Sequence, residues 1–164
     1  MKDKVIVITG ASAGIGAAVA RQAGAAGARV VLAARRREAL EEVARASGEG
    51  ALTVVTDVTV RSEVEALARA AIERFGHVDV WINNAGRGIS RLPSELTDED
   101  IDVMMRDNVK SALYGMQAIL PHFKGRGAGQ IINVSSMLGR VPYVPYADID
   151  AAERASPFAQ PRKA

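Results

Sequence analysis

The 164-residue sequence contains no cysteine, so disulfide bonds and thiolate chemistry are excluded. Aromatic residues make up only 4% of the chain, and the basic residues are dispersed except at positions 35–37, which argues against a nucleic-acid-binding face. There is no run of eighteen apolar residues, and the N-terminus lacks the apolar segment of a signal peptide. We therefore expect a globular, cytoplasmic protein that binds neither nucleic acid nor a membrane, and we predict no metal site.

The chain opens with a short apolar strand and a glycine-rich turn. Residues 5–8 are four consecutive β-branched residues, and a helical pattern begins near Ile15. Between them Gly10, Gly14 and Gly16 have the spacing Gly-x-x-x-Gly-x-Gly, which differs from the commoner Gly-x-Gly-x-x-Gly fingerprint. Because glycine has no Cβ atom, such a turn can bring backbone N–H groups and a helix N-terminus against a pyrophosphate. It can equally be a tight connection that binds no ligand.

Four further apolar strands are predicted, with helical stretches between them. They cover residues 29–34, 52–56, 79–82 and 130–134. Apolar strands that alternate with helices are typical of a parallel sheet covered by helices on both faces. Right-handed crossovers then give an α/β, doubly wound, Rossmann-like sheet, in which ligands bind at the carboxyl ends of the strands. The glycine-rich and polar motifs fall at such ends, which favours a nucleotide site there.

A long helix is predicted to begin near Thr97, whose hydroxyl can cap the first turn. Asn108 lies in this helix, and a buried amide needs hydrogen-bond partners. We expect the inner face of the helix to consist of Ile101, Met104, Met105, Asn108, Val109, Ala112, Leu113, Met116, Ile119 and Leu120.

The composition changes near residue 146. Residues 1–146 form the predicted Rossmann-like dinucleotide-binding domain. In residues 147–164 only Ile149 and Phe158 are large and apolar, and two prolines interrupt any long helix. We expect this polar tail to be poorly ordered.

Five motifs occur in a fixed order with helices between them. They are residues 9–16 (Thr-Gly-Ala-Ser-Ala-Gly-Ile-Gly), 57–58 (Asp-Val), 83–86 (Asn-Asn-Ala-Gly), Asn108, and 133–136 (Asn-Val-Ser-Ser). Together they resemble the short-chain dehydrogenase/reductase family over residues 4–142. The resemblance implies a doubly wound nucleotide-binding sheet and hydride transfer between a nicotinamide cofactor and an alcohol or carbonyl substrate.

The resemblance also implies roles for individual residues. Asn108 would anchor a catalytic water relay, and Ser136 would hold the substrate oxygen by a hydrogen bond. The cofactor contacts would fall into three groups: Gly10, Ser12, Gly14, Ile15 and Gly16 at the pyrophosphate and adjoining ribose, Asp57 and Val58 at the adenine, and Asn84, Ala85 and Gly86 along the cofactor channel. Structural roles stay open, since Asp57 can cap the following helix and Asn84 can satisfy backbone groups at a strand end.

The residues after the second strand bear on the choice of cofactor. In dinucleotide sites an acidic residue there binds the ribose 2′-hydroxyl, whereas an arginine accommodates a 2′-phosphate. This chain has Arg35 and Arg36 and no carboxylate before Glu38. We predict that Arg35 binds the phosphate, with Arg36 or Arg37 as solvated neighbours on the helix face, so NADP(H) is favoured over NAD(H).

The sequence departs from the family pattern after Ser136. The family's proton donor is a tyrosine about thirteen positions further on, followed four residues later by a lysine whose ammonium lowers the tyrosine pKa. Here Ile149 and Asp150 stand in that region, and no Tyr-x-x-x-Lys occurs in the chain. A frameshift or early end in a reductase gene would produce this pattern, and a purpose-built short relative is the alternative.

Two functions are compatible with these residues. One is an NADP-dependent oxidoreductase acting on CH–OH groups of a small-molecule alcohol or carbonyl, with turnover impaired by the missing tyrosine and lysine. The other is a non-catalytic nucleotide-binding or protein-interaction module. In both cases Ile131, Ile132 and Val134 would lie on an unpaired strand edge, so we expect self-association as a homo-oligomer or aggregate.

Overall fold

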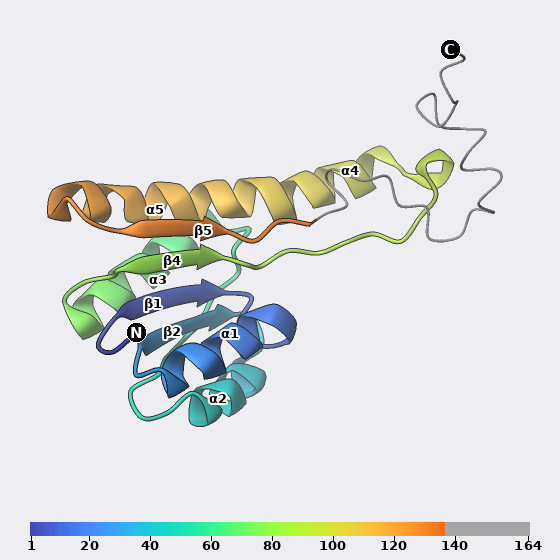
Figure 1. Ribbon diagram of the computed structural model, residues 1–164. Helices are drawn as coiled ribbons and strands as arrows, with labels where there is room; N and C mark the ends of the chain where they lie inside the picture. Colours follow the sequence, from blue (N-terminus) through green and yellow to red (C-terminus); the bar gives the residue numbers. More distant parts are fainter. Residues whose placement is uncertain (137–164) are drawn as a thin grey trace, which may run out of the picture.

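A computed structural model describes residues 1–136 of the chain (Figure 1). Its five strands are all parallel and form one sheet in the order β3-β2-β1-β4-β5. The strands are β1 (Val5–Thr9), β2 (Arg29–Ala34), β3 (Leu52–Val55), β4 (Val80–Asn83) and β5 (Gln130–Asn133). The predicted doubly wound, Rossmann-like sheet is confirmed.

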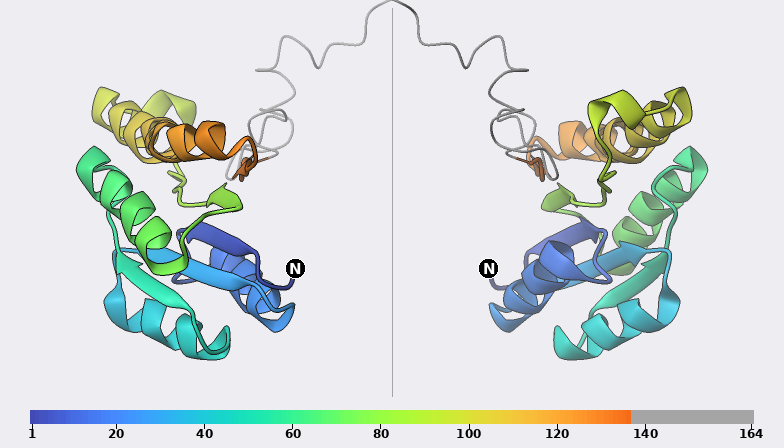
Figure 2. Two further views of the ribbon diagram at one scale, coloured as in Figure 1. Left: turned by 90° about the vertical axis from the view of Figure 1, so that its left-hand side faces the viewer. Right: turned by 90° about the vertical axis from the view of Figure 1, so that its right-hand side faces the viewer.

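Helices cover both faces of this sheet. Figures 1 and 2 show α1 and α2 against one face, and α3 and α5 against the other. The helices are α1 (Gly14–Ala25), α2 (Arg37–Ala46), α3 (Arg61–Phe75), α4 (Asp98–Met104) and α5 (Ser111–Arg126), with a 3₁₀ turn η1 (Pro93–Glu95) before α4 and a π-helical turn η2 (Met105–Lys110) between α4 and α5. The chain thus crosses from one face to the other after β3.

Alternation along the strands divides the core into two layers. Val5 and Val7 of β1 pack on the side of α3 and α5, together with the fully buried Trp81. Ile6 and Ile8 point the opposite way, toward the small residues of α1 and the apolar face of α2. Each large side chain buried in this way contributes about 1.5–3 kcal/mol to the free energy of unfolding. Burial of their side chains therefore fixes the central strands in place.

The long helix differs from the prediction in the face that it buries. Thr97 caps α4 as expected, since its hydroxyl accepts the N–H of Asp100 at 3.2 Å. The buried positions of α5 are Ser111, Gly115, Ile119 and Phe123, of which only Ile119 belongs to the predicted inner face. The exposed side chains include much of the predicted inner face: Ile101, Met105, Val109, Leu113 and Leu120.

Two physical reasons explain this error. A Cβ atom on Gly115 would collide with the side chains of Trp81 and Asn83, so the helix lies on its smallest residues, because these allow the closest approach to the sheet. In addition, α4 extends past the ends of the strands, so the sheet offers nothing there against which α4 can bury side chains (Figure 1).

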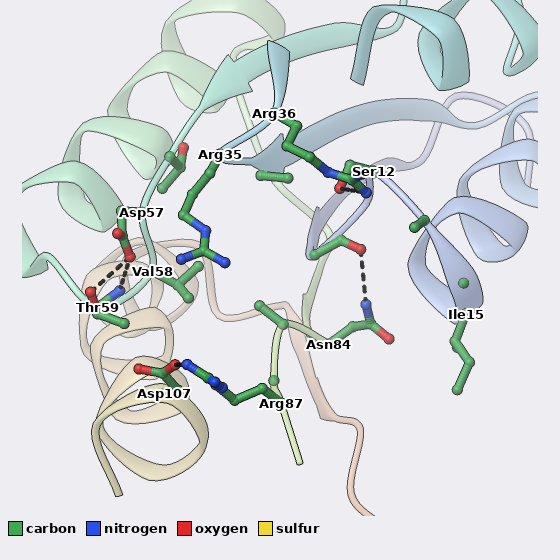
Figure 3. Close-up of a pocket in the computed structure, with 17 residues that line it drawn as sticks. Ser12, Ile15, Arg35, Arg36, Asp57, Val58, Thr59, Asn84, Arg87 and Asp107 are labelled. Carbon is green, nitrogen blue, oxygen red and sulfur yellow. Dashed lines mark hydrogen bonds and ion pairs between the residues drawn. The ribbon is translucent and has the colours of Figure 1, made fainter. Parts of the chain in front are cut away.

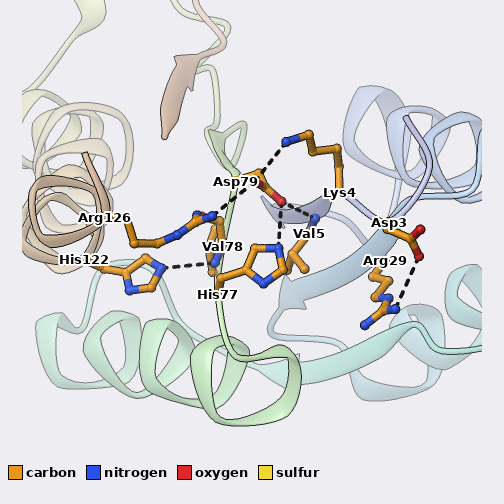
Figure 4. Close-up of polar contacts among 9 residues, drawn as sticks. All are labelled: Asp3, Lys4, Val5, Arg29, His77, Val78, Asp79, His122 and Arg126. Atoms are coloured by element: carbon orange, nitrogen blue, oxygen red, sulfur yellow. Dashed lines mark hydrogen bonds and ion pairs between the residues drawn. The ribbon is translucent and has the colours of Figure 1, made fainter. Parts of the chain in front are cut away.

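A polar network joins the elements at the opposite, amino end of the strands (Figure 4). The carboxylate of Asp79 accepts the backbone N–H of Val5 at 2.9 Å and the ammonium of Lys4 at 3.2 Å. His77 Nε2 lies 3.1 Å and Arg126 Nη2 3.7 Å from the same carboxylate. Burial acts to raise the pKa of Asp79, but the hydrogen bonds from Val5 and Lys4, with His77 nearby, hold this pKa below its ordinary value.

His122 completes this end of the molecule from α5. Its Nε2 accepts the backbone N–H of Val78 at 3.2 Å, which requires the neutral ring. Burial, together with Arg126 and His77 nearby, lowers the pKa of His122. Protonation of this ring therefore opposes the folded state.

Candidate functional site

A cavity of about 570 Å³ lies at the carboxyl ends of the strands, beside the point where the strand order reverses between β1 and β4 (Figure 3). Open α/β sheets bind their ligands at such a point. Every predicted cofactor-binding residue except Gly16 lines this cavity: Gly10, Ser12, Gly14, Ile15, Arg35, Asp57, Val58, Asn84, Ala85 and Gly86. The structure therefore brings together residues from four separate segments of the chain.

The glycine turn after β1 has a backbone that only glycine adopts readily. Gly10 has φ of +67° and Gly14 has φ of +55°. A Cβ atom on Gly10 would lie 2.8 Å from the Cα of Ala85, so the turn and the loop after β4 can meet only if position 10 is glycine. Gly16 lies behind the turn in α1, where a Cβ atom would come within 2.5 Å of the Gly10 carbonyl oxygen. Gly16 therefore allows α1 to pack closely against the turn, and it does not line the cavity.

Thr9 and Asn84 hold the turn against the end of β4. The Asn84 side-chain amide donates to the Thr9 carbonyl at 2.9 Å. The buried Thr9 hydroxyl accepts the backbone N–H groups of Asn84 and Ala85 at 3.0 and 3.1 Å. Asn84 thus satisfies backbone groups at a strand end, which is the structural role predicted for it. It also lines the cavity.

Arg35 and Arg36, the first two residues after β2, both line the cavity. Arg36 lines the cavity with Arg35, and its guanidinium donates to the Ser12 hydroxyl at 3.3 Å. Arg36 is exposed, as expected of a solvated neighbour, and it also belongs to the cavity wall. Arg37 begins α2, lies 4.0 Å from Glu41 in an exposed pair, and is absent from the cavity wall.

Asp57 is ionised and tied to a turn. Its Oδ1 accepts the backbone N–H of Thr59 at 2.9 Å and the Thr59 hydroxyl at 2.7 Å. Burial acts to raise the pKa of Asp57, but these hydrogen bonds, with Arg35 and Arg106 nearby, hold the pKa below its ordinary value. Asp57 closes the turn that precedes α3 and at the same time presents a carboxylate to the cavity.

The two predicted catalytic residues lie outside the cavity wall. The side chain of Asn108, in η2, accepts the N–H of Arg87 and donates to the Arg87 carbonyl, both at 2.9 Å. Ser136 follows β5 at the carboxyl edge of the sheet and is exposed. Positions 149 and 150, like the whole predicted tail at residues 147–164, lie outside the described residues.

Among the residues of the wall that sequence reasoning missed, two are charged: Arg87 and Asp107. Arg87 Nη1 lies 3.6 Å from one carboxylate oxygen of Asp107, and Arg106 Nε lies 3.1 Å from the other. No motif marks these positions. The useful signal is the position of Arg87 directly after residues 83–86, which follow a strand at the carboxyl edge.

The lining has the chemistry of a dinucleotide site. The glycine turn can admit a pyrophosphate, and Arg35 and Arg36 can hold a further phosphate. The Asp57 carboxylate can accept a hydrogen bond from an amino group. Within residues 1–136 there is no group of three acidic or histidine side chains placed to hold a metal ion, and no helix there is long and apolar enough to cross a bilayer.

Comparison with known proteins identifies the class. Residues 4–151 match the family model of the short chain dehydrogenases. Among curated proteins, an uncharacterized oxidoreductase of Staphylococcus epidermidis is 39% identical over 142 residues, which are 87% of this chain and 62% of that protein. An uncharacterized oxidoreductase of Bacillus subtilis is 43% identical over 143 residues, 85% of this chain and 40% of its own length.

Solved structures agree with this result. A crystal structure of the F189W actinorhodin polyketide ketoreductase with NADPH has a TM-score of 0.82 and 35% identity, covering 88% of this chain and 58% of that one. The crystal structure of serine dehydrogenase from Escherichia coli has a TM-score of 0.79 and 30% identity, covering 85% of this chain and 65% of that one.

The chain belongs to the short-chain dehydrogenase family, whose curated relatives are oxidoreductases. It spans about 62% of the length of the staphylococcal relative and about 40% of that of the Bacillus relative.

Proposed function

We propose that this chain binds NADP(H) in the cavity and takes part in hydride transfer between the nicotinamide and an alcohol or carbonyl group of a small-molecule substrate. The main support for this proposal is that Arg35 and Arg36 both line the cavity directly after β2, where an NAD site of this fold has a carboxylate. The similarity to a ketoreductase crystallised with NADPH supports the proposal.

Each part of the cavity has a role in this proposal. The N–H groups of the glycine turn and the N-terminus of α1 face the pyrophosphate. Arg35 and Arg36 hold the 2′-phosphate, with Ser12 orienting Arg36 through their hydrogen bond. Asp57 and Val58 contact the adenine, while Asn84, Ala85 and Gly86 form the channel wall. The bound cofactor would supply the hydride.

A charge reversal tests the cofactor preference. Arg35→Asp places a carboxylate where the 2′-phosphate would bind, so we expect it to invert the preference from NADPH to NADH in titration calorimetry. Arg37→Asp is the matched control, because it makes the same change in charge at the first residue of α2, which does not line the cavity. Equal affinity of the unaltered chain for the two nucleotides would contradict the proposal.

In the same proposal Asn108 anchors a catalytic water relay and Ser136 holds the substrate oxygen. In a polypeptide of this sequence no tyrosine is followed by lysine four residues later. Since general acid–base groups contribute about 10²–10⁴-fold to rate, we propose that its turnover is reduced by at least that factor.

A second candidate function, a nucleotide-binding or interaction module without catalysis, is favoured by one observation. Within residues 1–136, β5 pairs only with β4, and Ile132 and Val134 are 38% and 40% exposed. An unpaired strand edge is a template for another chain. We propose that the chain self-associates through this edge, and light scattering that shows a monomer at all concentrations would contradict it.

A further inference from the structure

Beyond Asn84 and Ala85, which Thr9 holds, the loop after β4 is held a second time at Arg87. Asn108 makes two hydrogen bonds of 2.9 Å to the Arg87 backbone, one as acceptor and one as donor. A Cβ atom on Gly86 would lie 2.9 Å from the same Asn108 oxygen, so glycine at position 86 lets the amide come this close. The loop could move only by breaking both bonds, and the side chain of Arg87 therefore starts from a defined point.

The side chain of Arg87 is then directed along the cavity wall. It extends from the loop to Asp107, on the side of the cavity opposite Ser12 and Arg36 (Figure 3). Asp107 is shared with Arg106, which takes the other carboxylate oxygen at 3.1 Å, so its charge is divided between two guanidinium groups. Arg87 remains 55% exposed and keeps unpaired capacity for a ligand.

The same end of the cavity contains groups suited to a flat, uncharged ring. Figure 3 shows Val58 between the guanidinium ends of Arg35 and Arg87, with Asp57 and Thr59 beside it. A guanidinium is planar and stacks on aromatic rings, and Val58 offers an apolar surface. If the pyrophosphate lies at the glycine turn and the 2′-phosphate at Arg35 and Arg36, the base must extend toward this end.

We propose that Arg87 is a base-binding residue, whose guanidinium packs against the adenine ring of the bound nucleotide and so adds to affinity for adenine nucleotides. This inference rests on the proposed nucleotide binding. Asp107 is a positioning residue, because it orients the guanidinium and does not itself touch the base. An ordinary exposed ion pair between Arg87 and Asp107 would contribute little to anything, so the two interpretations differ in what they predict for binding.

The test is calorimetric titration of the full chain with NADPH and with adenosine 2′,5′-bisphosphate. We expect Arg87→Ala to weaken both about 3- to 30-fold, the range of a cation–π contact that is partly shielded from water. Arg87→Lys should recover only part of this loss, because it retains the charge but loses the planar group that stacks on the ring. Arg91→Ala is the matched control: Arg91 lies in the same loop, pairs with Asp100 at 2.7 Å, and does not line the cavity.

A double substitution tests the positioning role. Asp107→Asn should weaken binding when Arg87 is present and have no further effect in Arg87→Ala, since the two residues act as a unit. Circular dichroism melts would show that each variant is folded.

The outcomes separate this inference from the proposed function. If the unaltered chain binds NADPH and Arg87→Ala binds it equally well, the inference is wrong and the proposed function stands. If Arg87→Lys retains full affinity while Arg87→Ala loses it, Arg87 acts through charge and the stacking contact is refuted. If the unaltered chain binds neither nucleotide, the proposed function and the inference both fail.

Discussion

Replacing Thr9 by valine removes the hydroxyl that joins β1 to the loop after β4, and we expect this to lower the free energy of unfolding. The Thr9 side chain is only 3% exposed. Its hydroxyl accepts from Asn84 and Ala85 and donates to the Ile82 carbonyl at 3.3 Å, which uses all of its hydrogen-bonding capacity. Valine has nearly the same shape, so the change isolates the hydroxyl.

The magnitude follows from the groups left without a partner. A buried N–H that loses its acceptor costs about 1–3 kcal/mol. Asn84 and Ala85 both line the cavity, where water can reach them, so the lower end of that range applies to each. We expect Thr9→Val to destabilise the chain by about 2 kcal/mol in total. Thr9→Ser keeps the hydroxyl and removes one buried methyl group, which costs about 1 kcal/mol.

Urea denaturation followed by circular dichroism measures both variants. With a slope of about 1–3 kcal/mol per molar urea, the difference between them should shift the midpoint by a few tenths of a molar or more. If Thr9→Val proves as stable as Thr9→Ser, the hydroxyl does not hold these elements together, and the account of how the cavity is assembled is wrong.

Three other measurements test separate parts of the structure. Gly10→Ala should destabilise the chain by about 1–2 kcal/mol, and further through the contact with Ala85, and it should weaken nucleotide binding, whereas Gly14→Ala, with open space around its Cβ position, should show only the backbone cost. Acid should destabilise the fold in two steps, below about pH 6.5 through His122 and below about pH 4 through Asp79, because folding lowers both pKa values and the unfolded chain therefore binds these protons more readily. The first step should be smaller in His122→Gln. Urea midpoints that do not differ between pH 5 and pH 7.5 would contradict this. Carbonyl reduction with NADPH should stay far below the roughly 1–10³ s⁻¹ typical of enzymes, and a turnover in that range would show that another group replaces the tyrosine.

The sheet was predictable because its signals are local. Four β-branched residues at positions 5–8 and the apolar runs after them predict strands, and parallel order follows from the helices between them. The glycine turn, Arg35 and Asp57 were found as well, since each directly follows a strand and therefore lies at the same edge.

The rest depends on contacts between distant segments. The long helix carries apolar residues on more than one side, and its inner face is decided by Ser111 and Gly115, which periodicity in hydrophobicity does not single out. Arg87 and Asp107 are 20 positions apart in the chain and meet only because η2 lies beside the loop after β4. The role of Thr9 likewise appears only when β1 and β4 are known to be neighbours.

The central claim is that the cavity binds a nicotinamide dinucleotide through its 2′-phosphate. Titration calorimetry of the unaltered chain with NADPH and NADH tests it most directly, because the two ligands differ only in that phosphate. We expect the chain to bind NADPH in a one-to-one ratio and to bind NADH more weakly. Binding of neither ligand, or equal binding of both, would contradict it.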